Sequence, residues 1–317
     1  MIRIGVVNID VSHPLAFAEK LLEGDKARYV AVYNDGFRSD EEVDAFIRKC
    51  GLECRCNTVE ELAEMVDVGF IQGCNWDKHL DYVEPFMKLG KPVFIDKPMV
   101  GCMKDIRRLE KLMAEGLQVI GSSSMRYAFE VADFLKIPVE ERGEIMHIMG
   151  TCGVDEFNYG IHVVEAIGAM VKNPVSVRYN GVGNKGGKRT ESYSVLFEDG
   201  TTADYITVTG VWMPCYFLVT TTKTVYNVNI DSSRVYEALL ERVCEQLETG
   251  AKVLSPVNEI IDSIKVMLAG RISRERNGEV VRLDEIPEDD LGYDGYAFEK
   301  EYAAGAGPIY LQALERE

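Results

Sequence analysis

The sequence has no excess of positive charge, no long hydrophobic run and no CxxC cysteine pair. Its 35 lysines and arginines are outnumbered by 52 acidic residues, which gives a net charge of −17. Nucleic acids and anionic membranes bind basic faces, so neither is predicted as a partner. No apolar run approaches the roughly 18 residues that span a bilayer. The first residues read as a strand rather than a secretory signal, and we expect a cytoplasmic protein.

The eight cysteines are scattered along the chain. This pattern is typical of reduced thiols in a cytosolic protein rather than of a disulfide framework. Cys50, Cys54 and Cys56 lie close together in sequence, but their spacing matches no zinc signature and no paired fourth ligand is nearby. We therefore predict no metal site.

At 317 residues, the chain is long enough for two domains. Roughly the first 120 residues alternate short apolar strands with amphipathic helices, which indicates a parallel α/β sheet. The strands are expected at Ile2–Val7, Tyr29–Tyr33, Val68–Ile71, Val93–Ile95 and Val119–Gly121. Helices are expected to begin near Pro14, to span Val59–Met65 after a Thr58 cap, and to span Asp77–Lys88 before a left-handed Gly90.

The pattern changes after about Arg126. A helix is expected around Phe157–Met170, and alternating strands follow, such as Tyr193–Phe197 and Thr201–Thr209 joined by a turn at Asp199-Gly200. The glycine-rich segment 184–189 lacks phosphate-loop spacing and is interpreted as a hairpin tip. Two helices come next, Val235–Thr249 and one opened by Ser255-Pro256. These features predict an α+β domain with a large, mostly antiparallel open sheet.

The most informative segment is the one in which strand Val93–Ile95 ends on Asp96, Lys97 and Pro98. Ligands bind at the carboxyl ends of strands in open parallel sheets, so Lys97 is expected beside a ligand. Pro98 favours an extended backbone at Lys97 and so restricts the direction of its ammonium group. The alternative is a solvated lysine at a strand end.

An acid-Lys-Pro at the end of such a strand resembles the signature of the Gfo/Idh/MocA family of nicotinamide-dependent sugar and polyol oxidoreductases. Three further segments resemble the family's pattern in the same order: Cys74–His79 after the fourth strand, Ser122–Tyr127 at the crossover, and Asn158–His162 in place of Asp-x-Gly-x-His. The resemblance covers nearly the whole chain. It implies a doubly wound Rossmann domain over residues 1–124, a substrate-binding and oligomerisation domain over 125–317, and a homodimer or homotetramer formed through the C-terminal sheet.

The dinucleotide loop departs from the family's GxGxxG and resembles a non-standard branch. All three glycines are replaced in Asn8-Ile9-Asp10-Val11-Ser12-His13. Asn and Asp tolerate a left-handed backbone, so the turn can survive. A carboxylate at Asp10 about 5 Å from a phosphate would repel it by roughly 3 kcal/mol at an effective dielectric of ~20. This cost disappears if Asp10 turns away or a cation intervenes. His13 could offset the repulsion by donating a hydrogen bond to the phosphate. Alternatively, the loop could face the substrate.

The resemblance implies a nicotinamide cofactor, NAD or NADP. An acid at the end of the second strand, which reads Val32-Tyr33-Asn34-Asp35, would bind the adenosine ribose and favour NAD, but Asn34 rather than an acid stands at the closest match. Arg38 follows and could hold a 2′-phosphate, so the choice stays open. The predicted cofactor-binding residues are Asn8, Ile9, Asp10, Ser12, His13, Asn34, Asp35, Arg38, Asn75, His79, Asp96 and Lys97. His79 could instead cap or pin the helix that follows it.

Oxidation of a sugar hydroxyl needs a hydride acceptor, a base and a positive group beside the developing alkoxide. We assign Lys97 as the positive group and His162 as the base, since a neutral imidazole works near neutral pH. Asn158 lies four residues before His162 and would share its helix face, and Tyr159 is a spare acid. The predicted substrate-binding residues are Asn158, Arg126, Asp10 and His13, although Arg126 could instead form an interdomain ion pair.

The predicted function is therefore a hydride transfer between nicotinamide and a hydroxyl of a sugar, polyol or related small molecule. A redox-neutral elimination or epimerisation with retained NAD would use the same residues. A non-catalytic ligand-binding relative is the third possibility, because the loop glycines are replaced and Asn158 cannot carry charge.

Overall fold

The computed structural model describes residues 1–121 and 123–315, and the chain forms two compact units. Unit 1 contains residues 1–121 and two later segments, 240–254 and 294–315. Unit 2 contains residues 123–239 and 255–293. The chain thus leaves unit 1 after residue 121, and two C-terminal segments return to it. Within the described residues, no helix is long and apolar enough to cross a membrane.

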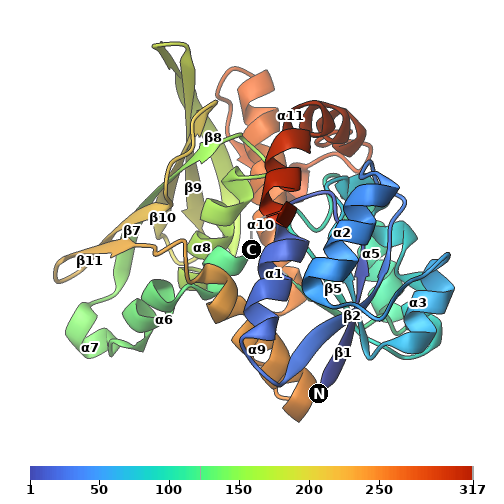
Figure 1. The fold of residues 1–317 in the computed structure, drawn as a ribbon. Coiled ribbons are helices and arrows are strands. Elements are labelled where there is room, and N and C mark those ends of the chain that lie inside the picture. Colours follow the sequence, from blue (N-terminus) through green and yellow to red (C-terminus); the bar gives the residue numbers. More distant parts are fainter. Residues whose placement is uncertain (122, 316–317) are drawn as a thin grey trace. The chain divides into compact units, whose positions relative to one another are not determined.

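Unit 1 is built on a six-stranded, fully parallel sheet in the order β3-β2-β1-β4-β5-β6 (Figure 1). Its strands are β1 (Ile2–Val7), β2 (Ala27–Tyr33), β3 (Cys54–Arg55), β4 (Val68–Ile71), β5 (Val93–Ile95) and β6 (Val119–Gly121). All five predicted strands are present, and β3 is an addition. β4 and β5 are buried along their whole length, as expected for a sheet covered on both faces. The order is that of a Rossmann fold, so the predicted fold class is confirmed for this unit.

The helices of unit 1 include the two predicted near Pro14 and after Thr58. They are α1 (His13–Leu22), α2 (Asp40–Cys50), α3 (Val59–Met65), η1 (Trp76–Asp81), α4 (Glu84–Lys88), α5 (Met103–Ala114), the later part of α9 (Val235–Thr249) and α11 (Gly295–Glu315). Thr58 caps α3 by accepting a hydrogen bond from Glu61 N at 3.1 Å. Gly90 has the predicted left-handed backbone, with φ of 65°.

The single helix predicted over Asp77–Lys88 is wrong. The segment forms a 3₁₀-helix, η1, and a separate short helix, α4. Pro85 lies in the first turn of α4, where its missing N–H costs nothing, whereas inside a continuous helix it would break the hydrogen-bond ladder. The break leaves η1 and the preceding loop as a distinct element at the carboxyl end of β4.

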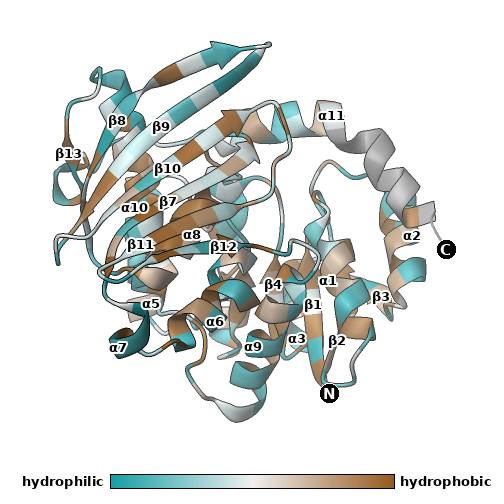
Figure 2. Ribbon diagram, turned by 90° about the vertical axis from the view of Figure 1, so that its left-hand side faces the viewer, coloured by the Kyte–Doolittle hydropathy of each residue, from teal (hydrophilic) through white to brown (hydrophobic). Residues whose placement is uncertain are grey.

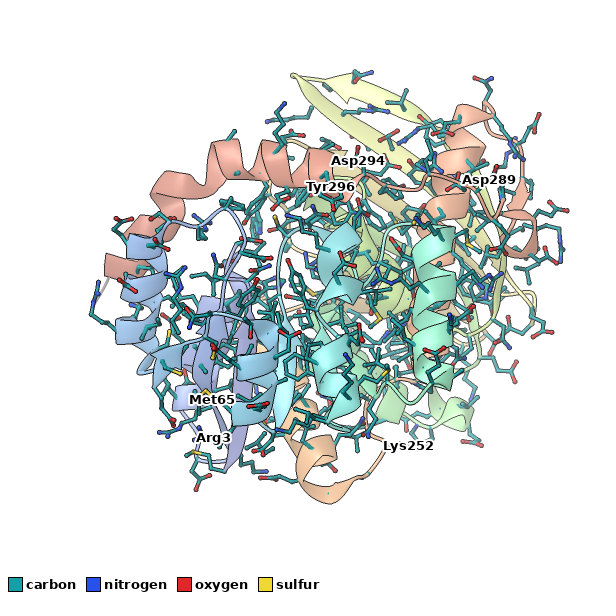
Figure 3. The ribbon with its side chains drawn as sticks, turned by 90° about the vertical axis from the view of Figure 1, so that its right-hand side faces the viewer. Arg3, Met65, Lys252, Asp289, Asp294 and Tyr296 are labelled. Atoms are coloured by element: carbon teal, nitrogen blue, oxygen red, sulfur yellow. The ribbon has the colours of Figure 1, made fainter. Side chains whose placement is uncertain are left out.

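The amino end of this sheet is held by polar contacts at the surface. Arg3 is the second residue of β1, and its guanidinium donates to both carboxylate oxygens of Glu53 at 2.9 Å. Its Nε also donates to the Met65 carbonyl at 3.2 Å, and Figure 3 labels both residues at this end. Exposed ion pairs of this kind stabilise little. The chemically varied side chains gather at the opposite, carboxyl edge.

Unit 2 is built on a seven-stranded sheet in the order β12-β11-β7-β10-β9-β8-β13. Its strands are β7 (Ile145–Val154), β8 (Pro174–Lys185), β9 (Lys188–Phe197), β10 (Thr202–Thr209), β11 (Tyr216–Thr221), β12 (Val225–Asn229) and β13 (Val281–Arg282). Only the β7–β10 pair is parallel. The predicted large, mostly antiparallel sheet is therefore confirmed, and segment 184–189 is a hairpin tip with Gly186 and Gly187 at positive φ.

The helices of unit 2 include α8 (Gly160–Met170) and α10 (Val257–Glu275), which pack on one face of the sheet. Figure 2 shows α8 coloured as hydrophobic along most of its length against the strands. Stacked rings of Tyr193 and Tyr205, with centroids 4.5 Å apart, lie in the core between them. The other helical elements are η2 (Ser124–Tyr127), α6 (Phe129–Lys136), α7 (Val139–Arg142) and η3 (Leu283–Glu285).

Candidate functional site at the carboxyl edge of unit 1

The loop after β1 keeps a tight turn without glycine. Asn8 adopts a left-handed backbone, with φ of 64°, which asparagine tolerates better than most residues. Its side-chain oxygen accepts hydrogen bonds from Asp35 N at 2.9 Å and Gly36 N at 3.2 Å. The Asn34 side-chain oxygen accepts from Ile9 N at 3.2 Å. The two asparagines therefore tie the ends of β1 and β2 together.

Asp10 points into the interior of this loop. Its Oδ2 accepts a hydrogen bond from Cys74 N at 3.1 Å. A Cβ on Gly36 would lie only 2.0 Å from its Oδ1, so only glycine fits at position 36. Burial raises the pKa of Asp10 to about 6. The turned carboxyl group lowers the repulsion that the sequence predicts between Asp10 and a phosphate.

The Arg38 guanidinium is hydrogen-bonded to the backbone of the same loop. Its Nε and Nη2 donate to the Asp10 carbonyl oxygen at 3.1 and 2.6 Å, and its Nη1 donates to Glu42 at 3.0 Å. The Arg38 side chain is almost fully buried. These contacts orient the guanidinium toward the protein, whereas the sequence suggested a 2′-phosphate as its partner.

The loop after β4 carries the predicted residues Asn75 and His79. The side chain of His79 is buried between two carbonyl oxygens, with Nδ1 3.1 Å from Met99 O and Nε2 2.9 Å from Gly73 O. Burial holds the pKa of His79 below its ordinary value. These contacts hold the loops after β4 and β5 to each other, whereas the alternative in the sequence analysis was that His79 caps or pins the helix after it.

Helix α11 closes over this loop. Glu299 accepts hydrogen bonds from Asn75 Nδ2 at 2.9 Å and from Lys78 Nζ at 3.0 Å to each of its oxygens. The ring centroids of Phe298 and Trp76 lie 5.0 Å apart. Gly295 N donates a hydrogen bond to Asp77 at 2.9 Å. Figure 3 labels the neighbouring residues Asp294 and Tyr296. The sequence did not predict these contacts, because no local motif marks the C-terminal segment as part of the Rossmann unit.

One group in the described residues has metal-ligand atoms close together. Asp10, Cys74 and Glu299 each offer an atom within 4.8 Å of the others. Glu299 is already paired with the Lys78 ammonium, and burial raises the pKa of the Cys74 thiol, so the thiolate ligand is disfavoured. Cys50, Cys54 and Cys56 do not form such a metal-ligand group within the described residues. Cys54 and Cys56 contact the Met65 sulfur instead.

The loop after β5 carries the lysine motif. The carboxylate of Asp96 is buried, with Oδ1 accepting from Lys97 N at 2.7 Å and Oδ2 2.6 Å from His13 Nδ1. Burial opposes ionisation of Asp96, but His13 and Lys97 hold its pKa below the ordinary value. Lys97 is half-buried, and its peptide bond to Pro98 is cis. His13 begins α1 directly after Ser12, so the β1 and β5 loops meet here.

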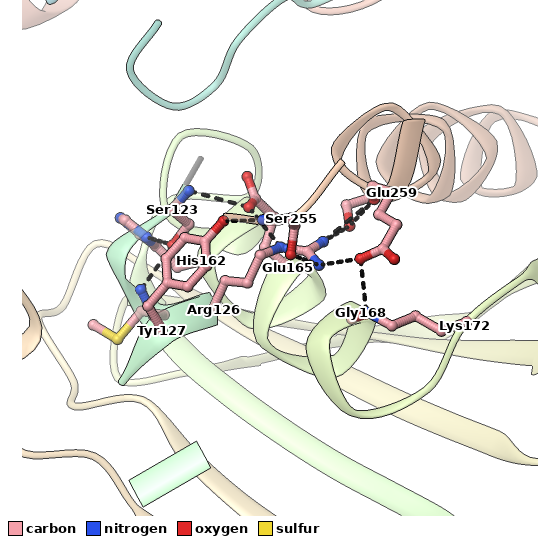
Figure 4. A network of polar contacts seen from close by, with 11 residues as sticks. Ser123, Arg126, Tyr127, His162, Glu165, Gly168, Lys172, Ser255 and Glu259 are labelled. Atoms are coloured by element: carbon pink, nitrogen blue, oxygen red, sulfur yellow. Dashed lines mark hydrogen bonds and ion pairs between the residues drawn. The ribbon is translucent and has the colours of Figure 1, made fainter. Parts of the chain in front are cut away.

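Of the remaining predicted residues, Arg126 and His162 belong to a buried polar network in unit 2 (Figure 4). The Nδ1 of His162 lies 2.5 Å from Ser123 Oγ, and Ser123 N donates to Glu165 at 3.1 Å. Arg126 is buried and pairs with Glu165 at 3.2 Å and Glu259 at 3.3 Å. Arg126 thus forms ion pairs inside unit 2. Ser122, part of the predicted crossover, lies outside the described residues.

The helix predicted around Phe157–Met170 begins later than expected. α8 starts at Gly160, so Asn158 lies in the preceding turn, where its Nδ2 is 3.4 Å from Asp155 Oδ2. The prediction that Asn158 and His162 share one face of a helix is therefore wrong. Asp155 also accepts from Tyr159 N at 3.0 Å and so competes with the helix for the first turn. Burial, with Asp155 nearby, raises the pKa of Tyr159, which makes it a weaker acid.

The structure thus separates the predicted residues into two groups. The β1, β2, β4 and β5 loops of unit 1 hold Asn8, Ile9, Asp10, Ser12, His13, Asn34, Asp35, Arg38, Asn75, His79, Asp96 and Lys97. Unit 2 holds Arg126, Asn158, Tyr159 and His162. Sequence reasoning missed Ser123 beside His162 and Glu299 beside Asn75, whose partners are 39 and 224 residues away in the chain.

Residues 4–122 match a family described as an oxidoreductase family with an NAD-binding Rossmann fold, GFO_IDH_MocA. The match confirms the predicted resemblance over these residues and the predicted class of cofactor, a nicotinamide dinucleotide. No curated protein matches the chain.

Several solved structures share the fold. A scyllo-inositol dehydrogenase from Lactobacillus casei has 16% identity and a TM-score of 0.76, with 90% of this chain and 98% of that chain covered. A structure of that enzyme with NAD(H) and scyllo-inositol bound has 15% identity and a TM-score of 0.73, covering 90% and 99%. A myo-inositol dehydrogenase from Corynebacterium glutamicum has 13% identity and a TM-score of 0.77, covering 89% and 99%.

The residues at the carboxyl edge of unit 1 fit a dinucleotide at several points. Asn8 supplies the left-handed turn that a glycine normally provides, and Asp10 directs its carboxyl group into the loop. Asp35 is exposed at the end of β2, where an acid binds the adenosine ribose. One feature opposes binding, because the Glu299 carboxylate already uses the Asn75 and Lys78 donors.

Proposed function

On the premise that unit 1 is the NAD-binding Rossmann domain of the Gfo/Idh/MocA family, we propose that the chain is an NAD-dependent oxidoreductase of a polyol or sugar hydroxyl. The observation that carries the proposal is the position of Lys97. It follows β5 at the carboxyl edge of the parallel sheet, with its backbone N–H bonded to the buried Asp96. Ligands of such sheets bind at this edge.

The side chains around the end of β2 favour NAD over NADP. Asp35 is exposed there, and its carboxylate would bind a ribose hydroxyl and repel a 2′-phosphate. The Arg38 guanidinium, which could otherwise neutralise that phosphate, is buried against the Asp10 carbonyl oxygen and Glu42. Asn34 accepts a hydrogen bond from Ile9 N, and Asp35 accepts one from the Tyr82 hydroxyl at 2.7 Å, but only Asp35 offers a charged acceptor to a ribose hydroxyl.

The proposed substrates are cyclic polyols of the inositol type and related sugars. This class comes from the fold neighbours that act on inositols and from the family's nicotinamide chemistry. The bound nicotinamide would accept or return a hydride. The chain would provide Lys97, whose ammonium stabilises the negative charge that develops on the substrate oxygen. The base role predicted for His162 stays a prediction, as does the substrate role of Asn158.

A panel of inositols and hexoses, each incubated with the protein and NAD, tests the proposal. We expect one or more compounds to produce reduced nicotinamide, with less product when NADP replaces NAD. Conversion of a sugar without net reduction of NAD would support the redox-neutral alternative. Binding of a polyol without binding of either dinucleotide would contradict the oxidoreductase proposal and support a ligand-binding relative.

A further inference from the structure

Three sulfur atoms meet at the outer edge of the unit 1 sheet. The Sγ atoms of Cys54 and Cys56 lie 3.7 and 3.8 Å from the Sδ atom of Met65. Cys54 begins β3, the outermost strand, Cys56 directly follows this strand, and Met65 is the last residue of α3. Figure 3 labels Met65 and the neighbouring Arg3 in this part of the unit. Residues from two elements thus form a group made only of sulfur.

The backbone around the two cysteines fixes the direction of their thiols. Glu53 N and Cys56 N donate to the carbonyl oxygens of Val30 and Val32 in β2 at 2.7 and 2.8 Å. These hydrogen bonds hold the short strand β3 against β2. Residues two apart along an extended chain project from the same face, so Cys54 and Cys56 both reach the same methionine on α3.

Helix α3 fixes the methionine side of the group. Thr58 caps the start of the helix by accepting from Glu61 N at 3.1 Å, and the Glu61 carboxylate accepts from Asn57 N at 2.7 Å. At the other end of the helix, the Met65 carbonyl oxygen accepts from Arg3 Nε at 3.2 Å. Both ends of α3 are therefore held by hydrogen bonds, and its last residue places the thioether against the two thiols.

The spacing and the chemistry of the three sulfurs suit one soft metal ion. With metal–sulfur bonds of about 2.3 Å, sulfurs around a trigonal or tetrahedral ion lie roughly 3.8–4.0 Å apart. Thiolates and thioethers are soft ligands, and a set made only of them favours monovalent copper. Zinc sites use cysteine, histidine and carboxylate ligands, so zinc spacings in the sequence do not reveal a group completed by a methionine. The group at Asp10 differs, because two of its three ligands are hard carboxylates.

An ion can reach the sulfurs from solvent. Met65 is 38% exposed and Cys54 is half-buried, while Cys56 is buried. Burial and the neighbouring Cys54 raise the pKa of the Cys56 thiol to about 12, but a thiol that coordinates a metal is deprotonated by it. The Arg3 guanidinium is close enough to Cys54 for their charges to interact, and it would offset the net negative charge of two thiolates around a monovalent ion.

We propose that Cys54, Cys56 and Met65 bind one monovalent copper ion. Two S–H bonds break as two copper–sulfur bonds form, and both protons leave to solvent. The methionine sulfur donates a lone pair, and copper stays monovalent, so no oxidant or reductant takes part. The bound ion would connect β3, which is only two residues long, to the end of α3. The site is separate from the proposed function, because none of its ligands is assigned to the dinucleotide or the substrate.

Competition with the copper(I) chelator bicinchoninate, in the absence of oxygen and with reductant present, measures the affinity of the full chain. We expect the wild type to take up one copper ion. A group that only supports a metal ligand is worth about 10–100-fold in affinity, so loss of a direct thiolate in Cys54→Ser should cost about a hundredfold or more. Met65→Leu should weaken binding by about tenfold or more. Wild-type affinity in both variants would overturn the proposal.

Matched controls separate this site from general thiol binding. Cys102→Ser removes another half-buried thiol, and Met213→Leu replaces a methionine that is 40% exposed. We expect both to bind copper as the wild type does. Copper should also raise the thermal unfolding temperature of the wild type and of both controls, but not of Cys54→Ser, because an ion that binds only the folded state stabilises it. Equal losses of affinity in Cys102→Ser and Cys54→Ser would overturn the proposal.

X-ray absorption at the copper edge identifies the ligands directly. We expect sulfur neighbours only, at about 2.3 Å, with one fewer in Met65→Leu than in the wild type. Nitrogen or oxygen neighbours, or an unchanged number of sulfurs in Met65→Leu, would overturn the proposal. Cys54→Ser should show the circular dichroism spectrum of the wild type, which excludes unfolding as the cause of lost copper. Copper binding by a chain that binds no dinucleotide would support this site while contradicting the proposed function.

Discussion

At the residue scale, the account depends most on Lys97. Its position could be predicted from the motif Asp96-Lys97-Pro98 after the buried strand β5. The proline restricts the backbone of the residue before it and so the direction of the Lys97 side chain. We expect Lys97→Ala to lower kcat by roughly a hundredfold or more, since one preorganised charge at the developing oxyanion is removed. NAD(H) titration of the same variant should show a retained cofactor site. Near-normal turnover in Lys97→Ala would contradict the role.

Asp10 gives a prediction about stability. Burial raises its pKa in the folded protein to about 6, above the ordinary value of 3.8, so the folded state holds the proton more tightly than the unfolded state. The free energy of unfolding therefore loses a contribution as pH rises from about 4 to 6, by roughly 2–3 kcal/mol. Asp10→Asn should lack this loss and be more stable than the wild type at pH 7. Urea unfolding at both ends of this range checks the difference, and equal pH dependence of the two proteins would count against it.

At the scale of elements, the parallel strands and most helices of unit 1 could be predicted, because alternating apolar segments, caps and proline act locally. Helix η1 and the late start of α8 could not. Pro85 interrupts the helix that would otherwise continue from η1 into α4, and Asp155 accepts from Tyr159 N before α8 begins. The return of α11 to unit 1 depends on contacts more than 200 residues apart in the chain, and no local pattern shows those.

Helix α11 also leads to a prediction about cofactor affinity. Its Glu299 carboxylate lies within 4.8 Å of Asp10 and Cys74 and binds the donors of the β4 loop. A dinucleotide at this edge would meet its negative charge. Glu299→Gln should therefore tighten NAD(H) binding by about tenfold, or roughly 1.4 kcal/mol. Glu301→Gln, exposed on the same helix, is the matched control. Weaker binding in Glu299→Gln would mean that α11 holds the cofactor rather than competing with it.

At the scale of the whole molecule, α8 and α10 pack on one face of the sheet of unit 2. Of the central-strand side chains on the opposite face, Ile206 is half-buried and Leu196 is 44% exposed. This agrees with the predicted homodimer or homotetramer through the C-terminal sheet, which stays a prediction. We expect Ile206→Asp to lower the oligomeric mass measured by light scattering, because a buried charge would be introduced at the interface. Leu291→Asp, at a position 91% exposed, should leave the mass unchanged. A monomeric wild type would contradict this prediction.

Binding of NAD(H) to the purified chain tests the central claim most directly. Calorimetric titration with NAD(H) and NADP(H) should follow denaturation of an aliquot to detect any nucleotide carried through purification. The account predicts micromolar NAD(H) binding or co-purified NAD, with weaker binding of NADP(H) because Asp35 repels the 2′-phosphate. If neither dinucleotide binds nor co-purifies, in the wild type and in Glu299→Gln alike, the oxidoreductase account is contradicted.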